Sequence, residues 1–445
     1  MRTTSEECRS RPGDVRSGSS IVRLRGVHSL LLLASALTGA CGLTDRRYTA
    51  DVVRDTLPNG VVRLRYVSFP PPASEPVAVE LRIGAVEGEP YEIFGDVRGI
   101  EVDADGNIYI LDYQASEVRA FDASGAFLRT LTRKGAGPGE LTEANGMVLR
   151  DSTLWIQDHG KWQMIGIDLE GEEVARHKMH VLSYGYIWNG AVDDRGRFWK
   201  ETSHSDEERT YPPPEGLNEG SSRSFLKWFD PATNATDSIF LGESTYQSYI
   251  SRNSRGGYTY RGIPFSARSL LLIDPAGGFW RSSGEAYRIA RLDESGDTTL
   301  VIEADVPPLP VTDEQRNAFI EDVVEREPDQ RRAAEELAAL APESRQVLDQ
   351  LILDDEGRLW ARRVAAEGEK PLFDIFTRDG EYLGSVRLRF QPASYFPPRI
   401  RYGSFYTLVR DSLDVPTVVR ATVPPLGHRD LIGMVRALHR RIRAT

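Results

Sequence analysis

Cysteine is almost missing from this chain of 445 residues, which holds only two. Cys8 lies in a segment that we expect to be removed, so Cys41 remains alone and the mature monomer has no internal disulfide. The apolar run Leu30–Leu37 is too short to span a bilayer. Basic residues number 55 against 66 acidic ones, a formal net charge of −11. This balance disfavours a phosphate-backbone partner, so we expect no binding to nucleic acid.

The first 40 residues have the pattern of a signal peptide. Six arginines precede the apolar run, and small residues follow it just before Cys41. A charged segment, a short apolar segment and a small-residue cleavage site are typical of export. The segment resembles a bacterial lipoprotein signal, with Cys41 as the lipidated residue. We therefore expect an exported protein held at the cell envelope by a lipid anchor on a bacterial membrane; ordinary secretion is the alternative.

An aromatic residue recurs along the chain in a short strand that follows a turn. Its positions are Tyr109, Trp155, Trp199, Trp280, Trp360 and Tyr406. The spacings are 46, 44, 81, 80 and 46 residues, and a four-strand unit of about 40–50 residues is the period of a propeller blade. The two long spacings fit one blade plus an insertion. The sequence thus predicts an all-β fold: a six-bladed β-propeller of four-stranded antiparallel blades with a small helical insertion.

Asp-rich turns precede most of these aromatics. They read VDADG at 102–106, VDDRG at 192–196, IDPAG at 273–277 and LDDEG at 353–357. The first resembles the start of a calcium loop, but Gly106 and Gln114 occupy the wrong positions for one. We interpret these Asp side chains as hydrogen-bond acceptors for their own turns, and the aromatics as core between blades.

The first blade carries a family resemblance. Residues 99–112 read GIEVDADGNIYILD, residues 118–131 read VRAFDASGAFLRTL, and the loop 134–140 reads KGAGPGE. Over about residues 75–425 the chain resembles bacterial six-bladed β-propellers related to NHL-repeat proteins. The resemblance implies a propeller and a secreted or lipid-anchored location, but no particular reaction.

Four segments follow from this pattern. Residues 1–40 form the signal peptide, 41–76 a lipid-anchored tether and linker with an early strand at Val61–Val67, 77–425 the propeller, and 426–445 a basic amphipathic tail. Within the propeller, Val77–Ile83 is expected to pair with Thr417–Val423 and so to close the last blade, leaving no open edge. The tail is expected to dock on its own domain or on an anionic membrane surface.

Two insertions are expected. Residues 202–222 and 243–268 are polar, the latter rich in Tyr, Arg and Gly, and we expect irregular loops over the propeller rim or a recognition surface. Residues 311–341 predict a helical hairpin on one propeller face, as a lid or as filler. Thr312 is its N-cap and Gln315 completes a capping box, while Pro328 interrupts the helix.

The candidate site is the set of loops that follow the second strand of each blade, near the channel mouth. They carry Asp112, Asp158, His159, Lys161, Glu201, Arg281, Ser283, Arg362 and Arg410. Charges of both signs suit a small polar ligand or a peptide; charges on the rim that face water are the alternative. No metal site is expected, because the pair His177 and His180 has no evident third ligand.

The sequence leaves it open whether the protein is an enzyme. Its pattern favours a monomeric ligand-binding or protein-interaction module without a cofactor, whose partner is a protein, a peptide or a small polar ligand. The alternative is a metal-dependent hydrolase or lactonase, or a lyase, that uses the propeller channel, and Ca²⁺ belongs only to that alternative.

Overall fold

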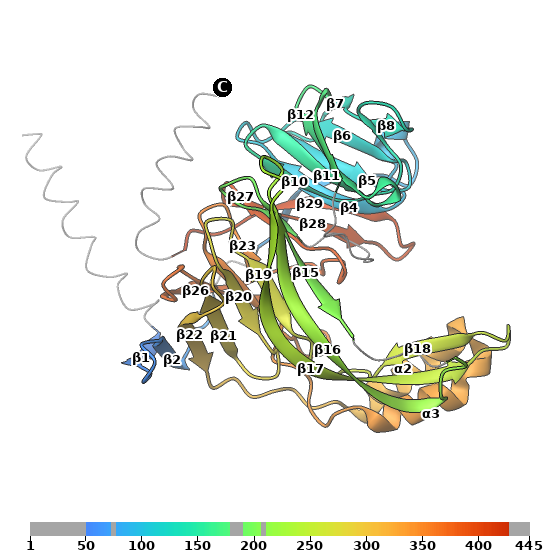
Figure 1. Ribbon diagram of the computed structural model, residues 1–445, viewed down its shortest axis with the longest axis vertical. Helices are drawn as coiled ribbons and strands as arrows, with labels where there is room; N and C mark the ends of the chain where they lie inside the picture. The colour runs from blue at the N-terminus through green and yellow to red at the C-terminus, as the bar shows by residue number, and fades with distance from the viewer. Residues whose placement is uncertain (1–49, 73–76, 179–189, 206–210, 427–445) are drawn as a thin grey trace, which may run out of the picture. The chain divides into compact units, whose positions relative to one another are not determined.

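The computed structural model describes residues 50–72, 77–178, 190–205 and 211–426 (Figure 1). The signal peptide, Cys41 and the basic tail therefore lie outside the described residues. No helix in these ranges is both long enough and apolar enough to cross a membrane. Strands dominate, and six sheets of at least four strands follow one another along the chain.

The first two blades are plain four-stranded meanders. Blade one consists of β4 (Val97–Val102), β5 (Ile108–Asp112), β6 (Glu117–Phe121) and β7 (Phe127–Thr130). Blade two consists of β10 (Ala144–Arg150), β11 (Thr153–Asp158), β12 (Gln163–Asp168) and β13 (Glu173–Lys178). The loop between them contains a short parallel pair, β8 (Arg133–Lys134) and β9 (Glu140–Leu141). Single 3₁₀ turns, η1 (Pro90–Glu92) and η2 (His159–Lys161), lie in loops.

Blades three and four both exceed four strands. Blade three consists of β14 (Ala191–Val192), β15 (Phe198–His204), β16 (Gly216–Phe229), β17 (Thr236–Arg252) and β18 (Tyr258–Gly262). Blade four consists of β19 (Leu270–Ile273), β20 (Phe279–Ser282), β21 (Arg288–Leu292) and β22 (Thr298–Ala304), extended by β2 (Val62–Ser68) and β1 (Asp51–Thr56).

The last two blades return to four strands. Blade five consists of β23 (Leu348–Leu353), β24 (Leu359–Arg363), β25 (Leu372–Phe376) and β26 (Tyr382–Arg387). Blade six consists of β27 (Arg399–Arg401), β28 (Ser404–Arg410), β29 (Pro416–Thr422) and β3 (Val79–Ile83). Since β3 pairs antiparallel with β29, with Ile83 opposite Val418, the predicted closure between the two ends of the propeller is confirmed.

Six hydrophobic clusters link the blades in a closed circuit. Each cluster joins residues of two consecutive blades, and the last joins blade six to blade one. Each recurring aromatic belongs to the cluster that its blade shares with the next blade. Five of the six are buried, whereas Trp155 is half-buried. The aromatic positions are thus confirmed as core, because a sheet that packs between two others buries both of its faces.

In blades one, three and five, the Asp of the turn and the aromatic six residues later are hydrogen-bonded to each other. Asp103 accepts from the Tyr109 hydroxyl at 2.9 Å and from two backbone N–H groups of its own turn. Asp354 likewise accepts from the Trp360 indole at 2.9 Å. These bonds confirm that the carboxylates serve their own turns, and they fix the orientation of each aromatic against the next blade.

Trp280 lacks this bond, which gives a matched pair for mutagenesis. Its indole nitrogen is buried without a hydrogen-bond partner among the described residues. Trp360→Phe and Trp280→Phe remove the same volume from fully buried sites, but only the first breaks a hydrogen bond. We expect Trp360→Phe to lower the free energy of unfolding by about 1–2 kcal/mol more than Trp280→Phe does. Equal losses in chemical denaturation would contradict this assignment.

Residues 51–68 belong to a blade rather than to a tether, and β2 confirms the strand expected at Val61–Val67. They form β1 and β2, and β2 runs parallel to β22 at the outer edge of blade four, with Leu64 opposite Ile302. The Tyr66 hydroxyl donates to the carbonyl of Gly380 at 2.6 Å and accepts from the Tyr382 N–H at 2.9 Å. This N-terminal segment is therefore part of the core that blades four and five share.

The segments 202–222 and 243–268 are mostly strand rather than loop. β16 and β17 pair along their whole lengths, from Gly216 opposite Ile250 to Phe229 opposite Thr236. β15 pairs with β16 only as far as Arg223, so the rest of the hairpin continues beyond the blade. β18 then folds back on residues 248–252 of β17. We call β18 and the parts of β16 and β17 beyond the blade the ribbon.

The helical insertion packs on this ribbon, not on a propeller face as a lid. It contains α2 (Asp313–Arg326), η3 (Pro328–Gln330) and α3 (Arg331–Leu340), and the predicted capping box of Thr312 and Gln315 is present. Ala333 and Leu337 pack against Tyr249 of β17. Figure 1 shows both helices beside β16, β17 and β18.

Candidate functional site

Two of the predicted site residues, Asp112 and Asp158, accept hydrogen bonds from the backbone of nearby loops. Asp112 is 1% exposed and accepts from four backbone N–H groups, those of Gly95, Asp96, Gln114 and Ala115. Asp158, at the same place in blade two, accepts from the backbone and hydroxyl of Thr142 and from the Glu143 N–H. Both carboxylates tie the loop that precedes a blade to the end of its second strand. In both residues, these hydrogen bonds engage both oxygens of the carboxylate.

The other predicted residues of blades two, five and six have local partners as well. His159 Nδ1 lies 3.5 Å from the Glu143 carboxylate, and Lys161 donates to the Gly135 carbonyl at 3.2 Å. Arg362 donates to Asp349 at 2.5 Å, and Arg410 donates to the Tyr395 hydroxyl at 3.0 Å.

Glu201 and Arg281 are brought together across blades three and four. Burial raises the pKa of the Glu201 carboxyl, and the nearby Arg281 partly opposes that shift. Arg281 also donates to the Leu241 carbonyl. Lys200, next to Glu201, is buried, which lowers the pKa of its ammonium to about 8. Ser283 is exposed in the loop that follows β20.

Metal-ligating residues do not gather in the described ranges, which hold no group of three or more His, Cys, Asp or Glu side chains in a metal-binding arrangement. His177 lies against Trp155, with ring centroids 5.9 Å apart, and burial lowers its pKa. His180 is outside the described residues.

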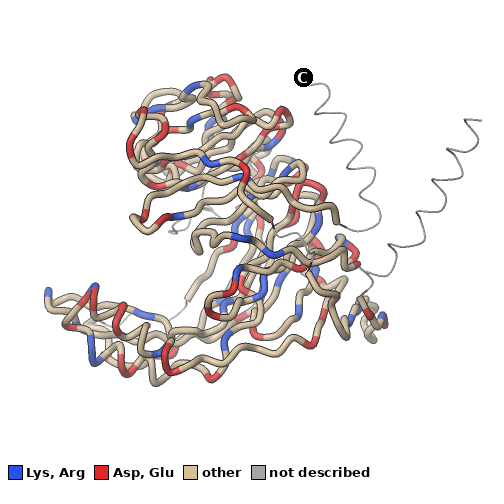
Figure 2. The backbone as a smooth tube through the Cα atoms, turned by 180° about the vertical axis from the view of Figure 1, so that it is seen from behind, with Lys and Arg blue, Asp and Glu red and all other residues tan. Residues whose placement is uncertain are grey.

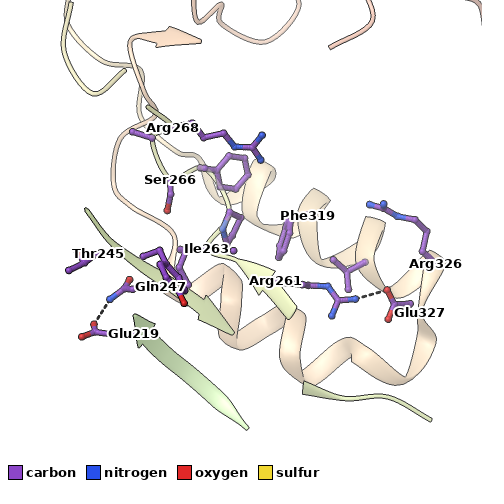
Figure 3. Close-up of a pocket in the computed structure, with 16 residues that line it drawn as sticks. Glu219, Thr245, Gln247, Arg261, Ile263, Ser266, Arg268, Phe319, Arg326 and Glu327 are labelled. Carbon is purple, nitrogen blue, oxygen red and sulfur yellow. Dashed lines mark hydrogen bonds and ion pairs between the residues drawn. The ribbon is translucent and has the colours of Figure 1, made fainter. Parts of the chain in front are cut away.

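A groove of about 900 Å³ lies between the ribbon and α2 (Figure 3). Three stretches of chain form it: residues 219 and 245–247 of the long hairpin, the end of β18 with the loop to residue 268, and residues 319–327 around the end of α2. None of the predicted site residues lines it. The Tyr- and Arg-rich composition of residues 243–268 was the signal in the sequence that pointed to this region.

One wall of the groove is apolar. Phe319 and Val323 of α2 face Ile263, Pro264 and Phe265 of the loop that follows β18. The rings of Phe265 and Phe319 are 6.5 Å apart and nearly perpendicular. Phe265 has φ 62°, a left-handed conformation that is an outlier for a bulky residue. Strain of this kind persists only where the surrounding contacts impose it, and it is concentrated at binding sites.

The other groups that line the groove are charged or polar. Arg261 forms an ion pair of 2.6 Å with Glu327, and Glu219 accepts from the Gln247 amide at 2.6 Å. Two further arginines are exposed: Arg326, which is paired with Asp322 on its own helix, and Arg268. The lining thus holds three arginines and two glutamates. Figure 2 shows that charges of both signs are mixed over the ribbon and helices.

This combination has the chemistry of a recognition site. Apolar and aromatic walls supply buried area, and a few fixed polar groups supply orientation. Aromatic residues and arginine are also the types that contribute most to binding at protein interfaces. The groove offers no nucleophile with an adjacent base and no cluster of metal ligands, so binding is the chemistry that its residues support.

One comparison with known protein families agrees with the fold. A family model described as a 6-bladed beta-propeller, DUF5128, matches residues 93–210, which span blades one and two and the start of blade three. No curated protein sequence gives a significant match.

Several solved structures align with most of the chain at low similarity. A DUF4221 family member from Bacteroides vulgatus is 12% identical, with a TM-score of 0.46 over 78% of this chain and 97% of its own. A streptogramin B lyase is 10% identical, with a TM-score of 0.38 over 78% of this chain and 98% of its own. A virginiamycin B lyase from Staphylococcus aureus is 10% identical, with a TM-score of 0.33 over 74% of this chain and 95% of its own.

Proposed function

We propose that this protein is an exported, cell-envelope propeller that acts as a protein-interaction module, and that the groove between the ribbon and α2 binds a polypeptide segment of its partner. The observation that carries the proposal is the groove itself. Two insertions, from blade three and from the connection between blades four and five, meet to form it.

The contacts within the groove favour a ready-formed site. Arg261 and Glu327 hold the end of α2 against β18, and the Ser254 N–H donates to Asp329 just beyond. Gln330, which is buried, accepts from the Ser251 hydroxyl and donates to the Arg252 carbonyl. Because these bonds fix both walls, little ordering entropy remains to be lost on binding.

The location is proposed from the sequence. Lipidation of Cys41 would hold the propeller at a bacterial membrane through residues 42–49, without a membrane-spanning helix. A single acyl chain binds a membrane reversibly, so stable anchoring takes a second signal, which is either another acyl chain or a basic patch. If the full-length protein is exported in its bacterial host, Cys41→Ser should move it from the membrane fraction to the soluble fraction. Unchanged partition would contradict the lipid anchor.

The binding proposal is tested by selecting random dodecapeptides on the soluble chain that begins at residue 50. Selected peptides should bind Arg268→Glu/Arg326→Glu at least about tenfold more weakly than the wild type, because the exposed guanidinium groups become carboxylates. Arg255→Glu is the matched control. Arg255 is equally exposed, at the tip of the turn between β17 and β18, but lies outside the groove lining.

Two results would overturn the proposal. One is the absence of any enriched peptide, and the other is a set of enriched peptides that bind the double variant as tightly as the wild type. The variant's melting temperature serves as the folding control. The alternative, a metal-dependent hydrolase, lactonase or lyase that uses the channel, has no specific observation in its favour among the described side chains.

A further inference from the structure

The outer edge of β17 is only partly covered. β18 pairs with residues 248–252, and its last residue, Gly262, lies opposite Ser248. On its other side, β17 remains paired with β16 through Glu243–Gln247. Within the parts of the chain that the structure describes, no strand pairs with the outer edge of this five-residue stretch.

The groove lies against this uncovered edge. Thr245, Tyr246 and Gln247 line it, and so does the chain from Ile263 to Arg268, which leaves the end of β18 and turns away. Space is therefore present where a continuation of β18 would run beside β17. Unpaired strand edges are usually blocked by charge, proline or a covering element, because they attract other chains.

We propose that the groove takes an extended, acidic polypeptide by strand addition to Glu243–Gln247, in line with β18. This inference rests on the proposed function and specifies how the partner segment binds in the groove. Five residues of strand span about 17 Å. In strand addition, main-chain hydrogen bonds supply affinity and alternate side chains supply specificity.

Side chains alternate along β17, and this alternation tells which side of an added strand would face the helices. Tyr249 and Ser251 of β17 contact the helices through Glu336 and Gln330, so odd-numbered residues such as Gln247 face the helices. Even-numbered residues, Tyr246 among them, face the opposite side. An added strand follows the same period of two. Every second side chain of the added segment would therefore face the helices, from which Phe319 and Val323 line the groove.

The charged residues around the groove favour an acidic segment. Arg261 is neutralised by Glu327 within the groove. Arg326 and Arg268 stand at its rim, and the partner of Arg326, Asp322, does not line the groove. Glu219 is the remaining acid of the groove lining, and it already accepts from Gln247; Glu243, at the far end of the stretch, is exposed but does not line the groove. A carboxylate on the bound segment would therefore meet guanidinium donors, whereas a basic segment would meet like charge.

The test uses the peptides selected on the wild-type chain, resynthesised with one N-methylated backbone amide at a time. Strand addition predicts that methylation at every second position lowers affinity at least about tenfold, while methylation at the intervening positions changes it less than about twofold. The selected sequences should carry acidic residues and lack proline in the central five positions.

The outcomes separate this inference from the proposed function. Peptides that lose affinity for Arg268→Glu/Arg326→Glu but tolerate methylation at every position would leave the groove as the site and overturn strand addition. Selected peptides that are basic, proline-rich or helical would also overturn strand addition. Peptides that show the alternating methylation pattern but bind the double variant normally would place strand addition at another edge, and would overturn both proposals.

Discussion

Removing residues 50–76 from the soluble chain is expected to lower its melting temperature by about 10 °C. The deletion removes β1 and β2, and with them two buried side chains of the core that blades four and five share, Leu64 and Tyr66. Loss of a buried large side chain costs about 2–5 kcal/mol, and in a chain of this size each kcal/mol shifts Tm by about 1–2 °C. The comparison is between chains that begin at residue 50 and at residue 77.

Tyr66→Ala in the longer chain is the control for a deletion that fails to fold. It removes the ring that stacks on Phe69 at 5.4 Å and the hydroxyl that bonds to Gly380 and Tyr382. It should lower the free energy of unfolding by about 3–5 kcal/mol. If the two chain lengths melted at the same temperature and Tyr66→Ala had no effect, residues 50–72 would be a tether after all.

Asp374→Ala is expected to be the most damaging substitution of a polar residue. Asp374 is fully buried and accepts from the Tyr287 hydroxyl at 2.7 Å, from Arg363 at 2.6 and 3.0 Å, and from the Ser385 hydroxyl. Burial, followed by the negative charge of Asp374, raises the pKa of Tyr287 well above its usual value. Breaking a buried pair by removing one partner costs about 3–5 kcal/mol, because the remaining charge is uncompensated.

Asp349→Ala is the matched control. Asp349 also pairs with an arginine of β24, Arg362, but its side chain is 28% exposed. A partly exposed pair contributes about 0–1 kcal/mol, so its removal should have a small effect on chemical denaturation. Equal losses for the two variants would show that burial of Asp374 does not set its contribution.

The blades could be predicted because their signals are local. An Asp-rich turn and an aromatic residue six positions later lie within one hairpin, and the bond between Asp103 and Tyr109 shows why the two occur together. The period of these pairs then gave the number of blades. Closure followed from the alternation of Val77–Ile83, because a propeller leaves no free edge.

A strand at Val61–Val67 was predicted, but its place in blade four and the groove could not be predicted, because their contacts are distant in sequence. β2 pairs with β22, more than 200 residues away, and nothing in the turn pattern indicates that pairing. The ribbon contains several Ser and Gly residues, which are typical of turns and loops. Arg261 and Glu327, which join the two sides of the groove, lie 66 residues apart. Two residues of the predicted site, Asp112 and Asp158, look unpaired in the sequence for a related reason: the loop N–H groups that bond to their carboxylates lie 16 or 17 residues earlier in the chain.

Hydrogen exchange of the chain from residue 50, with and without a selected peptide, shows whether the peptide binds in the groove between the ribbon and α2. With the peptide bound, we expect slower exchange of backbone amides in residues 243–247, 261–268 and 319–327. Exchange at the loops that follow the second strand of each blade should be unchanged. Protection confined to those loops, around Asp158 to Lys161, Glu201, Arg281 and Arg362, would contradict this expectation and would place binding at the channel mouth.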